Sequence, residues 1–483
     1  MRKKFYLTTA IDYANAPVHL GHSLEKVQAD VLARYHRILG EDVFFLTGTD
    51  ENAQKNVLAA EKENISPKKF VDKNVNFAKQ LWRKFEISFD YFIRTTNKKV
   101  HWPGVKKIWL KCKGNGDIYK KNYSGLYCSG CEAFIKEKDL KNGLCPYHLK
   151  KPELVSEENY FFRLSRYQKQ LEKTIEKDEI KIFPEERKFE VLNFIKSGLE
   201  DFSISRPKER MKGWGIPVPE DKSQIIYVWF DALINYVSAI GYGREEKKFK
   251  KYWPADLHII GKDILKFHAV YWPAMLLSAK LPLPKRILCH GFITVEGQKM
   301  SKSLGNIVNP LEIIEKYGAD SLRYFLLVET PPFEDLDFTF EKFKKRYNSD
   351  LASGLGNLVA RIIALAKKLN VKSPKLRIED KELKTEISKA KEKWEKSLEE
   401  FKFNEGLISI WELISFGDRY LEKKKPWELF KLKQKEAKPV ISDLLSLLVE
   451  IAKLLEPFLP KTSKKILNQT KNPTKSEILF PKI

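Results

Sequence analysis

The sequence predicts an α/β fold in which a parallel-sheet domain of the Rossmann type is split by an insertion and followed by an all-α helical bundle. Strands and amphipathic helices alternate up to about residue 115. A polar, loop-rich stretch with paired cysteines then interrupts the pattern, and amphipathic helices with few strands dominate beyond residue 340. From these changes we predict domains at 1–115, 116–225, 226–325, 326–350 and 351–483.

Length and charge limit the class of protein. The chain has 483 residues, too many for one core, and 88 Lys and Arg against 64 Asp and Glu give a net charge of +24. This surplus favours a polyanionic partner such as nucleic acid, although a Lys-rich composition can also serve only to solvate the surface. No apolar run reaches the roughly 18 residues that span a bilayer, and the N-terminus enters a strand directly. We therefore expect a cytoplasmic protein without a membrane partner.

The first predicted strand is Phe5–Ile11. A polar turn follows it and leads to the run Pro-Val-His-Leu-Gly-His at 17–22, where a long amphipathic helix begins. A strand, a tight turn and a helix N-terminus together present free backbone N–H groups and a positive dipole end to an anion. Gly21 leaves room for a base or ribose, and the imidazoles of His19 and His22 can both point at the same phosphates. Taken alone, the two histidines would more often be ordinary helix-start residues.

Two strands end in a carboxylate at the predicted ligand edge of the sheet. The first is Asp42–Asp50, and because ligands bind at the carboxyl ends of parallel strands, Asp50 is placed to meet one. It could also cap the helix that begins at Glu51. The stretch His258–His268 has the same pattern, a strand followed by a glycine, Gly261, and a carboxylate, Asp263.

A zinc knuckle is predicted inside the insertion, at residues 128–148. Cys128 and Cys131 form one chelating pair, and Cys145 and His148 form a second pair after a spacer of thirteen residues. Two pairs with two residues between ligands are typical of a tetrahedral Cys3His zinc site, whereas the alternative is a set of free cysteines. Four protein ligands leave zinc no open position, so the site should be structural.

The stretch Ile225–Tyr236 is predicted as a strand running into a helix, with Trp229 and Tyr236 reaching toward the ligand edge of the sheet. Aromatic residues near the edge of a sheet more often belong to the hydrophobic core than to a ligand site. Arg206, which precedes this stretch, could hold an anionic group or form a structural ion pair.

A second run, Gln-Lys-Met-Ser-Lys-Ser-Leu-Gly-Asn at 298–306, favours a functional role for His19 and His22. With Pro17–His22, it resembles the two signatures of the class I aminoacyl-tRNA synthetases, a His-x-Gly-His motif and a Lys-Met-Ser-Lys-Ser loop, in the right order. Over nearly the whole chain the resemblance narrows to the methionyl-tRNA synthetases of the bacterial type with a single zinc knuckle. It implies an enzyme, methionine–tRNA ligase, that makes methionyl-adenylate and pyrophosphate from L-methionine and ATP. Methionine then passes to the 3′ end of tRNA(Met), in translation.

The resemblance also implies roles for individual residues. For catalysis it implies His19, His22, Asp50, Lys299 and Lys302. For ATP it implies His19, Gly21, His22, Gly261, Asp263, Lys299, Ser301 and Lys302, with Mg²⁺ accompanying the nucleotide. For methionine it implies Ala10, Ile11, Tyr13, Asp50, Trp229, Ala232, Leu233, Tyr236, Ile264 and His268. For the CAU anticodon of tRNA(Met) it implies Asn357, Arg361, Pro426 and Trp427.

The sequence departs from the family pattern beside the active site. The usual continuation after Asp50 is Glu-His-Gly, whereas here it is Glu-Asn-Ala at 51–53, and Asp12 stands where relatives often have Pro or an aromatic residue. The insertion at 116–225 has no room for the editing domain of the synthetases for Ile, Val or Leu. The chain stops at Ile483 without an appended oligonucleotide-binding barrel, so a monomer is expected.

Three rival functions follow from the same residues. A synthetase for another apolar amino acid is the nearest alternative. A small-molecule adenylyltransferase shares the His-x-Gly-His motif but would leave the bundle and the insertion without a purpose. A non-catalytic RNA-binding paralogue is disfavoured because His19, His22, Lys299 and Lys302 are all present.

Overall fold

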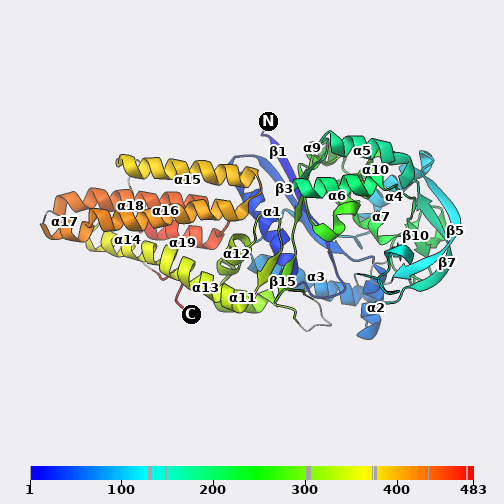
Figure 1. Cartoon of the computed structure of the whole chain (residues 1–483), viewed down its shortest axis with the longest axis horizontal. Helices are drawn as coiled ribbons and strands as arrows, with labels where there is room; N and C mark the ends of the chain where they lie inside the picture. The colour runs from blue at the N-terminus through cyan, green and yellow to red at the C-terminus, as the bar shows by residue number, and fades with distance from the viewer. Residues whose placement is uncertain are drawn as a thin grey trace. The chain divides into compact units, whose positions relative to one another are not determined.

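The computed structural model describes residues 2–128, 133–135, 137–146, 150–300, 306–371, 374, 378–432, 434–474 and 477–483. The chain divides into two compact units whose segments interleave along the sequence (Figure 1). Unit 1 comprises Met1–Val18, Gly40–Gln80 and Phe89–His290. Unit 2 comprises His19–Leu39, Leu81–Ser88 and Gly291–Ile483.

A seven-stranded sheet in which every pair of neighbours is parallel forms the centre of unit 1, with the order β2-β3-β1-β13-β14-β8 and β4 added beside β3. Its strands are β1 (Lys4–Thr9), β2 (Asp12–Tyr13), β3 (Asp42–Asp50), β4 (Tyr91–Arg94), β8 (Lys181–Phe183), β13 (Leu257–Gly261) and β14 (Arg286–His290). Parallel strands are covered on both faces, which explains the continuous apolar runs in β1 and β3. The prediction of a Rossmann-type parallel sheet is confirmed.

Two sequence segments pair differently from the expectation. β8 lies inside the stretch predicted as the insertion, yet it is the edge strand of the parallel sheet beside β14. The strand expected at Ile225 is β12 (Asp221–Ile226), which belongs to a small antiparallel sheet with β10 (Ser205–Pro207) and β11 (Pro217–Val218). Because Lys222 and Ser223 are exposed, β12 suits an outer sheet better than a doubly covered one.

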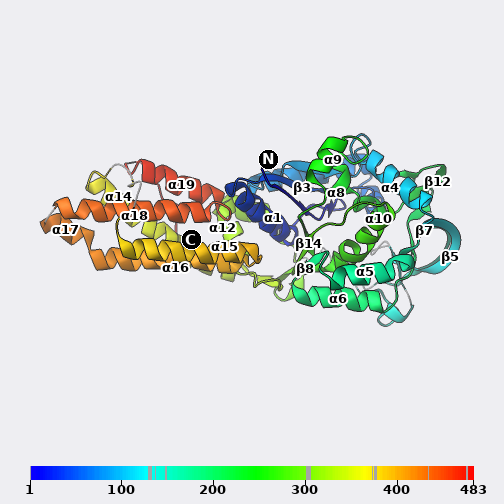
Figure 2. The same ribbon diagram turned by 90° about the horizontal axis from the view of Figure 1, so that it is seen from above.

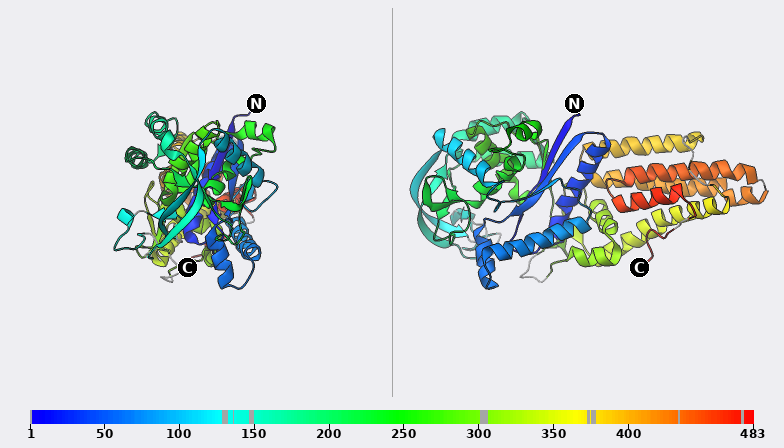
Figure 3. Two further views of the ribbon diagram at one scale, coloured as in Figure 1. Left: turned by 90° about the vertical axis from the view of Figure 1, so that its right-hand side faces the viewer. Right: turned by 180° about the vertical axis from the view of Figure 1, so that it is seen from behind.

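A long antiparallel hairpin carries the residues around the predicted knuckle. It consists of β5 (Ile118–Cys128) and β7 (Glu153–Phe162), flanked by β6 (Ala133–Ile135) and β9 (Phe202–Ser203). Figures 1 and 3 show β5 and β7 as a pair of long curved strands.

Helices pack around these sheets in unit 1. They are α2 (Gln54–Lys62), α3 (Pro67–Lys84, whose last turn belongs to unit 2), α4 (Trp102–Gly114), α5 (Gln168–Glu176), α6 (Glu185–Lys196), α7 (Val228–Ala232), α8 (Asn235–Ser238), α9 (Glu246–Tyr252) and α10 (Trp272–Ser278). A single apolar core joins α4, α7, α8 and α10 to the sheet through large side chains such as Trp109, Phe230 and Trp272.

Unit 2 contains α1 (Leu20–Ile38), a small sheet of β15 (Ile293–Val295), β16 (Gln298–Lys299) and β17 (Leu336–Phe338), and a helical bundle. Its other helices are α11 (Pro310–Tyr317), α12 (Ala319–Val328), α13 (Phe340–Arg346), the π-helix η6 (Tyr347–Gly356), α14 (Asn357–Lys368), α15 (Lys381–Glu399), α16 (Phe403–Lys424), α17 (Pro426–Leu432), α18 (Gln434–Leu455) and α19 (Pro460–Lys471). Figures 1 and 2 show α14, α16, α18 and α19 side by side, with α17 at one end. The predicted all-α bundle is confirmed.

Residues Phe340–Lys368, from α13 to α14, form one continuous helix. By length and composition Phe340–Lys368 could cross a membrane. Its buried residues, including Leu358 and Ile362, lie in the part of the helix that packs against α16, α18 and α19. Burial of this kind is also what a core helix of a bundle requires.

Candidate functional site: an amino-acid pocket and a nucleotide motif

A cavity in unit 1 lies where β1, β2 and β3 end. Ala10 and Ile11 follow β1, Tyr13 lies in β2 and Asp50 is the last residue of β3. The whole lining consists of Ala10, Ile11, Tyr13, Asp50, Trp229, Ala232, Leu233, Asn235, Tyr236, Ile264 and His268. Every residue that the sequence predicts for the methionine pocket is in this set. Asn235 is the lining residue that the sequence analysis missed, although it directly precedes Tyr236 on α8.

A hydrogen-bond chain fixes the polar wall of the cavity. The Tyr236 Oη and the His268 Nε2 are 2.7 Å apart, and the His268 Nδ1 lies 3.0 Å from the Ile264 carbonyl oxygen. Because a carbonyl can only accept, the proton of the neutral imidazole sits on Nδ1, and Nε2 accepts from the Tyr236 hydroxyl. Both polar hydrogens of this wall therefore have partners within the protein.

Aromatic rings form another part of the cavity lining. The ring of Trp229 stacks on that of Phe267, with centroids 3.7 Å apart and planes 1° from parallel. The Lys55 Nζ lies 3.6 Å from the centroid of the Tyr13 ring. A polarizable, aromatic-rich lining of this kind suits a thioether side chain.

The residue after Asp50 anchors the end of β3. The carboxylate of Glu51 accepts two hydrogen bonds from the guanidinium of Arg94, at 2.7 and 2.8 Å, and its backbone N–H donates to the Thr95 hydroxyl at 2.8 Å. Glu51 is fully buried, so this bidentate pair fixes the backbone on which Asp50 stands.

A second carboxylate stands at the end of β13. Gly261 is the last residue of that strand, and a Cβ on it would lie 3.0 Å from an oxygen of Asp263. Glycine therefore leaves space for the exposed Asp263 carboxylate, at the strand end where the family resemblance implies contact with ATP. Arg206 is buried, stacks at 4.3 Å on the Tyr227 ring and donates to the Ser203 hydroxyl at 2.8 Å.

In unit 2 the two predicted histidines cap the start of α1. The His19 Nδ1 accepts from the backbone N–H of Gly21, and the His22 Nδ1 accepts from the backbone N–H of His19, each at 3.1 Å. Since both Nδ1 atoms accept, each imidazole carries its proton on Nε2. Burial, together with the charge of Lys26, lowers the pKa of His22 to about 4. His22 is therefore a neutral hydrogen-bond donor at physiological pH.

Met300, the second residue of the predicted lysine loop, and the segment after this loop contact the start of α1. A Cβ on Gly21 would lie 3.2 Å from the Cε of Met300, and the Leu20 N–H donates to the Val308 carbonyl at 3.2 Å. Ser301 and Lys302, and the side chain of Lys299, lie outside the described residues. Met300 nevertheless brings the two signature motifs together within unit 2.

A family model described as tRNA synthetases class I (M) matches residues 5–151 and 137–363. The chain belongs to the class I methionyl-tRNA synthetase family. A second model, the anticodon binding domain of methionyl tRNA ligase, matches residues 373–479.

Curated relatives agree with this assignment. The chain is 45% identical over 476 residues to the methionine–tRNA ligase of Caldanaerobacter subterraneus, covering 97% of this chain and 74% of the relative. It is 44% identical over 477 residues to the methionine–tRNA ligase of Clostridium acetobutylicum, covering 97% of this chain and 73% of the relative.

Solved structures share the fold of both units. Mycobacterium tuberculosis methionyl-tRNA synthetase in complex with methionyl-adenylate matches with a TM-score of 0.91 at 37% identity, covering 97% of this chain and 95% of that one. The apo form of the same enzyme matches with a TM-score of 0.86 at 33% identity, covering 100% and 99%. The predicted family and fold class are confirmed.

The predicted zinc ligands are described only in part. Cys128, the last residue of β5, and Cys145 are both buried, whereas Cys131 and His148 lie outside the described residues. In the described part of the chain, no group of three or more His, Cys, Asp or Glu side chains is arranged to hold a metal ion. Two buried thiols at the predicted positions fit the donor set of a structural zinc site.

The residues predicted to read the anticodon lie at two places in unit 2, within the continuous helix Phe340–Lys368 and at the start of α17. Asn357 is exposed at the start of α14, and Arg361 follows one turn later, where its guanidinium pairs with Asp418 and Glu422 on α16. Pro426 and Trp427 open α17, and Trp427 is partly exposed.

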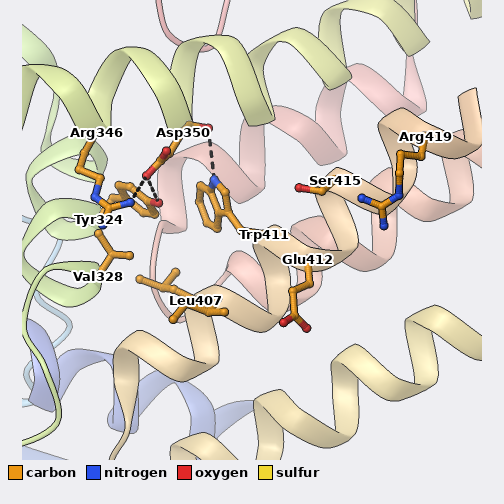
Figure 4. A pocket seen from close by; sticks show the side chains of 10 residues that line it. Tyr324, Val328, Arg346, Asp350, Leu407, Trp411, Glu412, Ser415 and Arg419 are labelled. Atoms are coloured by element: carbon orange, nitrogen blue, oxygen red, sulfur yellow. Dashed lines mark hydrogen bonds and ion pairs between the residues drawn. The ribbon is translucent and has the colours of Figure 1, made fainter. Parts of the chain in front are cut away.

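A larger cavity in the same unit lies between α12, η6 and α16 (Figure 4). Asp350 organises its wall: its carboxylate accepts from the Tyr324 hydroxyl at 2.8 Å and from Arg346 at 3.2 Å, and its carbonyl accepts from Trp411 at 3.3 Å. The Tyr324 and Trp411 rings have centroids 4.4 Å apart. The residues predicted for methionine, ATP or the anticodon are absent from this lining.

Proposed function

We propose that this chain activates L-methionine with ATP to give methionyl-adenylate and pyrophosphate, and then transfers methionine to the 3′ end of tRNA(Met). The observation that carries the proposal is the cavity of unit 1, because all the residues implied for methionine by the family resemblance line it. Membership of the class I methionyl-tRNA synthetase family supports the reaction type.

The first step needs alignment more than acid–base chemistry. The carboxylate of methionine is ionised at neutral pH and attacks the α-phosphate of ATP, and pyrophosphate leaves. We assign the Nε2–H groups of His19 and His22 to the phosphates, since both Nδ1 atoms accept from the backbone. Mg²⁺ bound to ATP supplies charge neutralisation at the phosphates. Lys299, Ser301 and Lys302 are assigned to the leaving pyrophosphate by the family motif.

Selectivity for methionine rests on the Tyr236–His268 wall. Contacts between apolar groups discriminate only about tenfold per methylene, so a polar contact to sulfur is needed to reject leucine. We assign this contact to the Tyr236 hydroxyl, which lines the cavity with His268 and would exchange its hydrogen bond to the His268 Nε2 for one to the sulfur. The carboxylate of Asp50 supplies a counter-charge for the amino group of methionine.

A pyrophosphate-exchange screen across the amino acids tests the function. We expect ATP–pyrophosphate exchange with methionine, and exchange lower by about 10² or more with leucine, isoleucine and valine. Preferred exchange with one of these three would identify a synthetase for that amino acid. Exchange with none of the amino acids would instead favour a small-molecule adenylyltransferase or an RNA-binding paralogue.

We also propose one structural Zn²⁺ held by Cys128, Cys131, Cys145 and His148. A closed site of this kind stabilises a segment with little core of its own, so chelation or Cys145→Ser should unfold the tip of the β5–β7 hairpin. Metal analysis should give one zinc per chain, and hydrogen exchange should rise around residues 126–135. Cys289→Ser is a matched control, because this buried cysteine lies in β14, outside the knuckle. An intact hairpin in a zinc-free protein would refute the site.

The bundle of unit 2 is assigned to tRNA(Met). Bases of an RNA loop are read by stacking on aromatic rings and by hydrogen bonds to their edges, which suits Trp427 and the Asn357–Arg361 pair for the CAU anticodon. The net charge of +24 favours the same polyanion. We propose that the enzyme acts as a cytoplasmic monomer.

A further inference from the structure

Beneath the amino-acid pocket lies a buried polar chain formed by Asn52, Asp231 and His101. The Asn52 Nδ2 donates to one oxygen of the Asp231 carboxylate at 2.7 Å and to the Thr95 carbonyl at 3.1 Å. The other oxygen of Asp231 lies 2.6 Å from the His101 Nε2. Asp231 and His101 are fully buried and Asn52 is 1% exposed, so this chain has no contact with solvent.

His101 is itself oriented by a fourth group. Its Nδ1 lies 2.8 Å from the Ser238 hydroxyl, which is fully buried on α8. Because a carboxylate can only accept, the His101 Nε2 carries a proton toward Asp231. Each oxygen of Asp231 thus receives one N–H donor, and loss of either donor would leave a buried carboxylate partly unsatisfied.

These contacts connect two walls of the pocket. Asn52 stands two residues after Asp50, at the end of β3, and Asp231 lies in α7 between Trp229 and Ala232. Asp50, Trp229 and Ala232 all line the cavity, whereas Asn52, Asp231 and His101 are not lining residues. The Asn52–Asp231 hydrogen bond therefore ties the carboxylate-bearing edge of the pocket to its aromatic wall.

We propose that Asn52 is a positioning residue that sets methionine affinity by holding Asp231, and with it α7, against the end of β3. The proposal rests on the proposed function, since it takes the cavity to be the methionine site. Asn52 touches neither substrate in this assignment, so its loss should change the KM for methionine far more than kcat or the KM for ATP.

Asn52→Asp is the most informative variant, because it replaces the amide donor by a second carboxylate beside Asp231. Two buried carboxylates in contact hold one proton between them at low pH, which keeps a hydrogen bond, and repel each other once that proton is lost. The facing titratable group is His101, while the nearby Glu51 and Arg94 are bonded to each other. We expect the KM for methionine in pyrophosphate exchange to rise about tenfold from pH 6 to pH 8.5 in Asn52→Asp, and less than about twofold in the unsubstituted chain.

Exchanging the two groups gives a rescue. In the double variant Asn52→Asp with Asp231→Asn, the new amide at 231 donates to the carboxylate at 52 and its carbonyl oxygen accepts from His101, while the weaker contact to the Thr95 carbonyl is lost. We expect this double variant to recover the methionine KM of the unsubstituted chain to within about threefold and to lose the pH dependence. A role in stability alone would not restore the KM in this way.

Asn115→Asp is the matched control. The Asn115 Nδ2 also donates at 2.7 Å to a fully buried carboxylate, that of Asp117, but neither residue lines the pocket. This variant should change the melting temperature with pH and leave the methionine KM unchanged.

The possible results distinguish failure of the positioning role of Asn52 from failure of the proposed function. A methionine KM in Asn52→Asp that stays flat with pH, in an unsubstituted chain that exchanges pyrophosphate with methionine, overturns the positioning role. A double variant that folds but keeps the high KM overturns it as well. Absence of methionine-dependent exchange in the unsubstituted chain contradicts the proposed function instead. If Asn52→Asp alone does not fold, the double variant still decides the matter.

Discussion

Replacing Arg323 by methionine is expected to destabilise the α1 region of unit 2 by about 3–5 kcal/mol, the usual cost of removing one partner from a buried ion pair. Arg323 is fully buried on α12 and lies 2.8 Å from the equally buried Asp30 of α1. Its guanidinium also donates to the carbonyls of Phe458 at 2.6 Å, Pro457 at 2.9 Å and Phe85 at 3.1 Å. Methionine fills similar space but leaves these acceptors without their donor.

The pH dependence of this effect has a definite sign. Burial alone would raise the pKa of Asp30, but the charges of Arg323 and Arg34 lower it below its ordinary value. A carboxylate with a lowered pKa stabilises the fold above its unfolded-state pKa, and that stability is lost as the pH falls through the folded-state pKa. Loss of Arg323 should therefore move the acid unfolding of this region to higher pH.

Hydrogen exchange of the α1 amides at pH 7 measures the destabilisation locally. Arg34→Met is the matched control, because Arg34 is partly exposed and pairs with the same carboxylate along one helix, at 2.8 Å. We expect it to cost about 1 kcal/mol or less. Equal protection of α1 in the two variants would contradict the proposed role of Arg323, and Asp30→Asn added to Arg323→Met should recover part of the loss.

The second large effect is expected from Lys302→Ala, which should lower the rate of pyrophosphate exchange by about 10² or more and leave the dissociation constant for methionine nearly unchanged. The reason is the role proposed above for this lysine: a donor to the leaving pyrophosphate would stabilise the charge that grows there in the transition state. Exchange kinetics and equilibrium methionine binding measure the two quantities separately.

Trp427→Ala provides the converse control. This residue opens α17 and is assigned to stacking on an anticodon base, so its loss should weaken tRNA charging and leave pyrophosphate exchange intact. If Lys302→Ala reduced methionine binding and exchange equally, the lysine would act in binding and not in the transition state. If Trp427→Ala reduced both activities equally, its role would be structural.

Local sequence patterns predicted the central elements well. β3 spans Asp42–Asp50 as expected, because an uninterrupted apolar run ending in a polar residue is characteristic of a covered parallel strand. The helix expected after His19 begins at Leu20 and ends at Ile38, with Gly40 at a φ of +78°. The methionine-pocket residues came from the family resemblance, and they line one cavity although they are distributed from Ala10 to His268.

Other features depend on partners distant in sequence, which no local pattern reveals. Lys181–Phe183 is too short to be recognised as a strand from the sequence, and it is a strand because it pairs with β14. Asn235 looks like an ordinary helix-start residue until the cavity is seen. The departure at Asn52 was visible in the sequence, but its partner Asp231 lies 179 residues away. Buried charges such as Arg323 are likewise explained only by their tertiary contacts.

The contacts of Arg323 have a consequence for synthesis on the ribosome. The carbonyl of Phe458 that it binds is translated 135 residues after it, and Asp30 is translated long before both. At roughly 5–20 residues per second, the wait between Arg323 and Phe458 alone is about 7–27 s. The nascent α1 therefore cannot reach its final environment until most of the chain has been made. We expect chaperones to cover the apolar face of α1 during elongation. A domain that folds as soon as it leaves the ribosome would not need this protection.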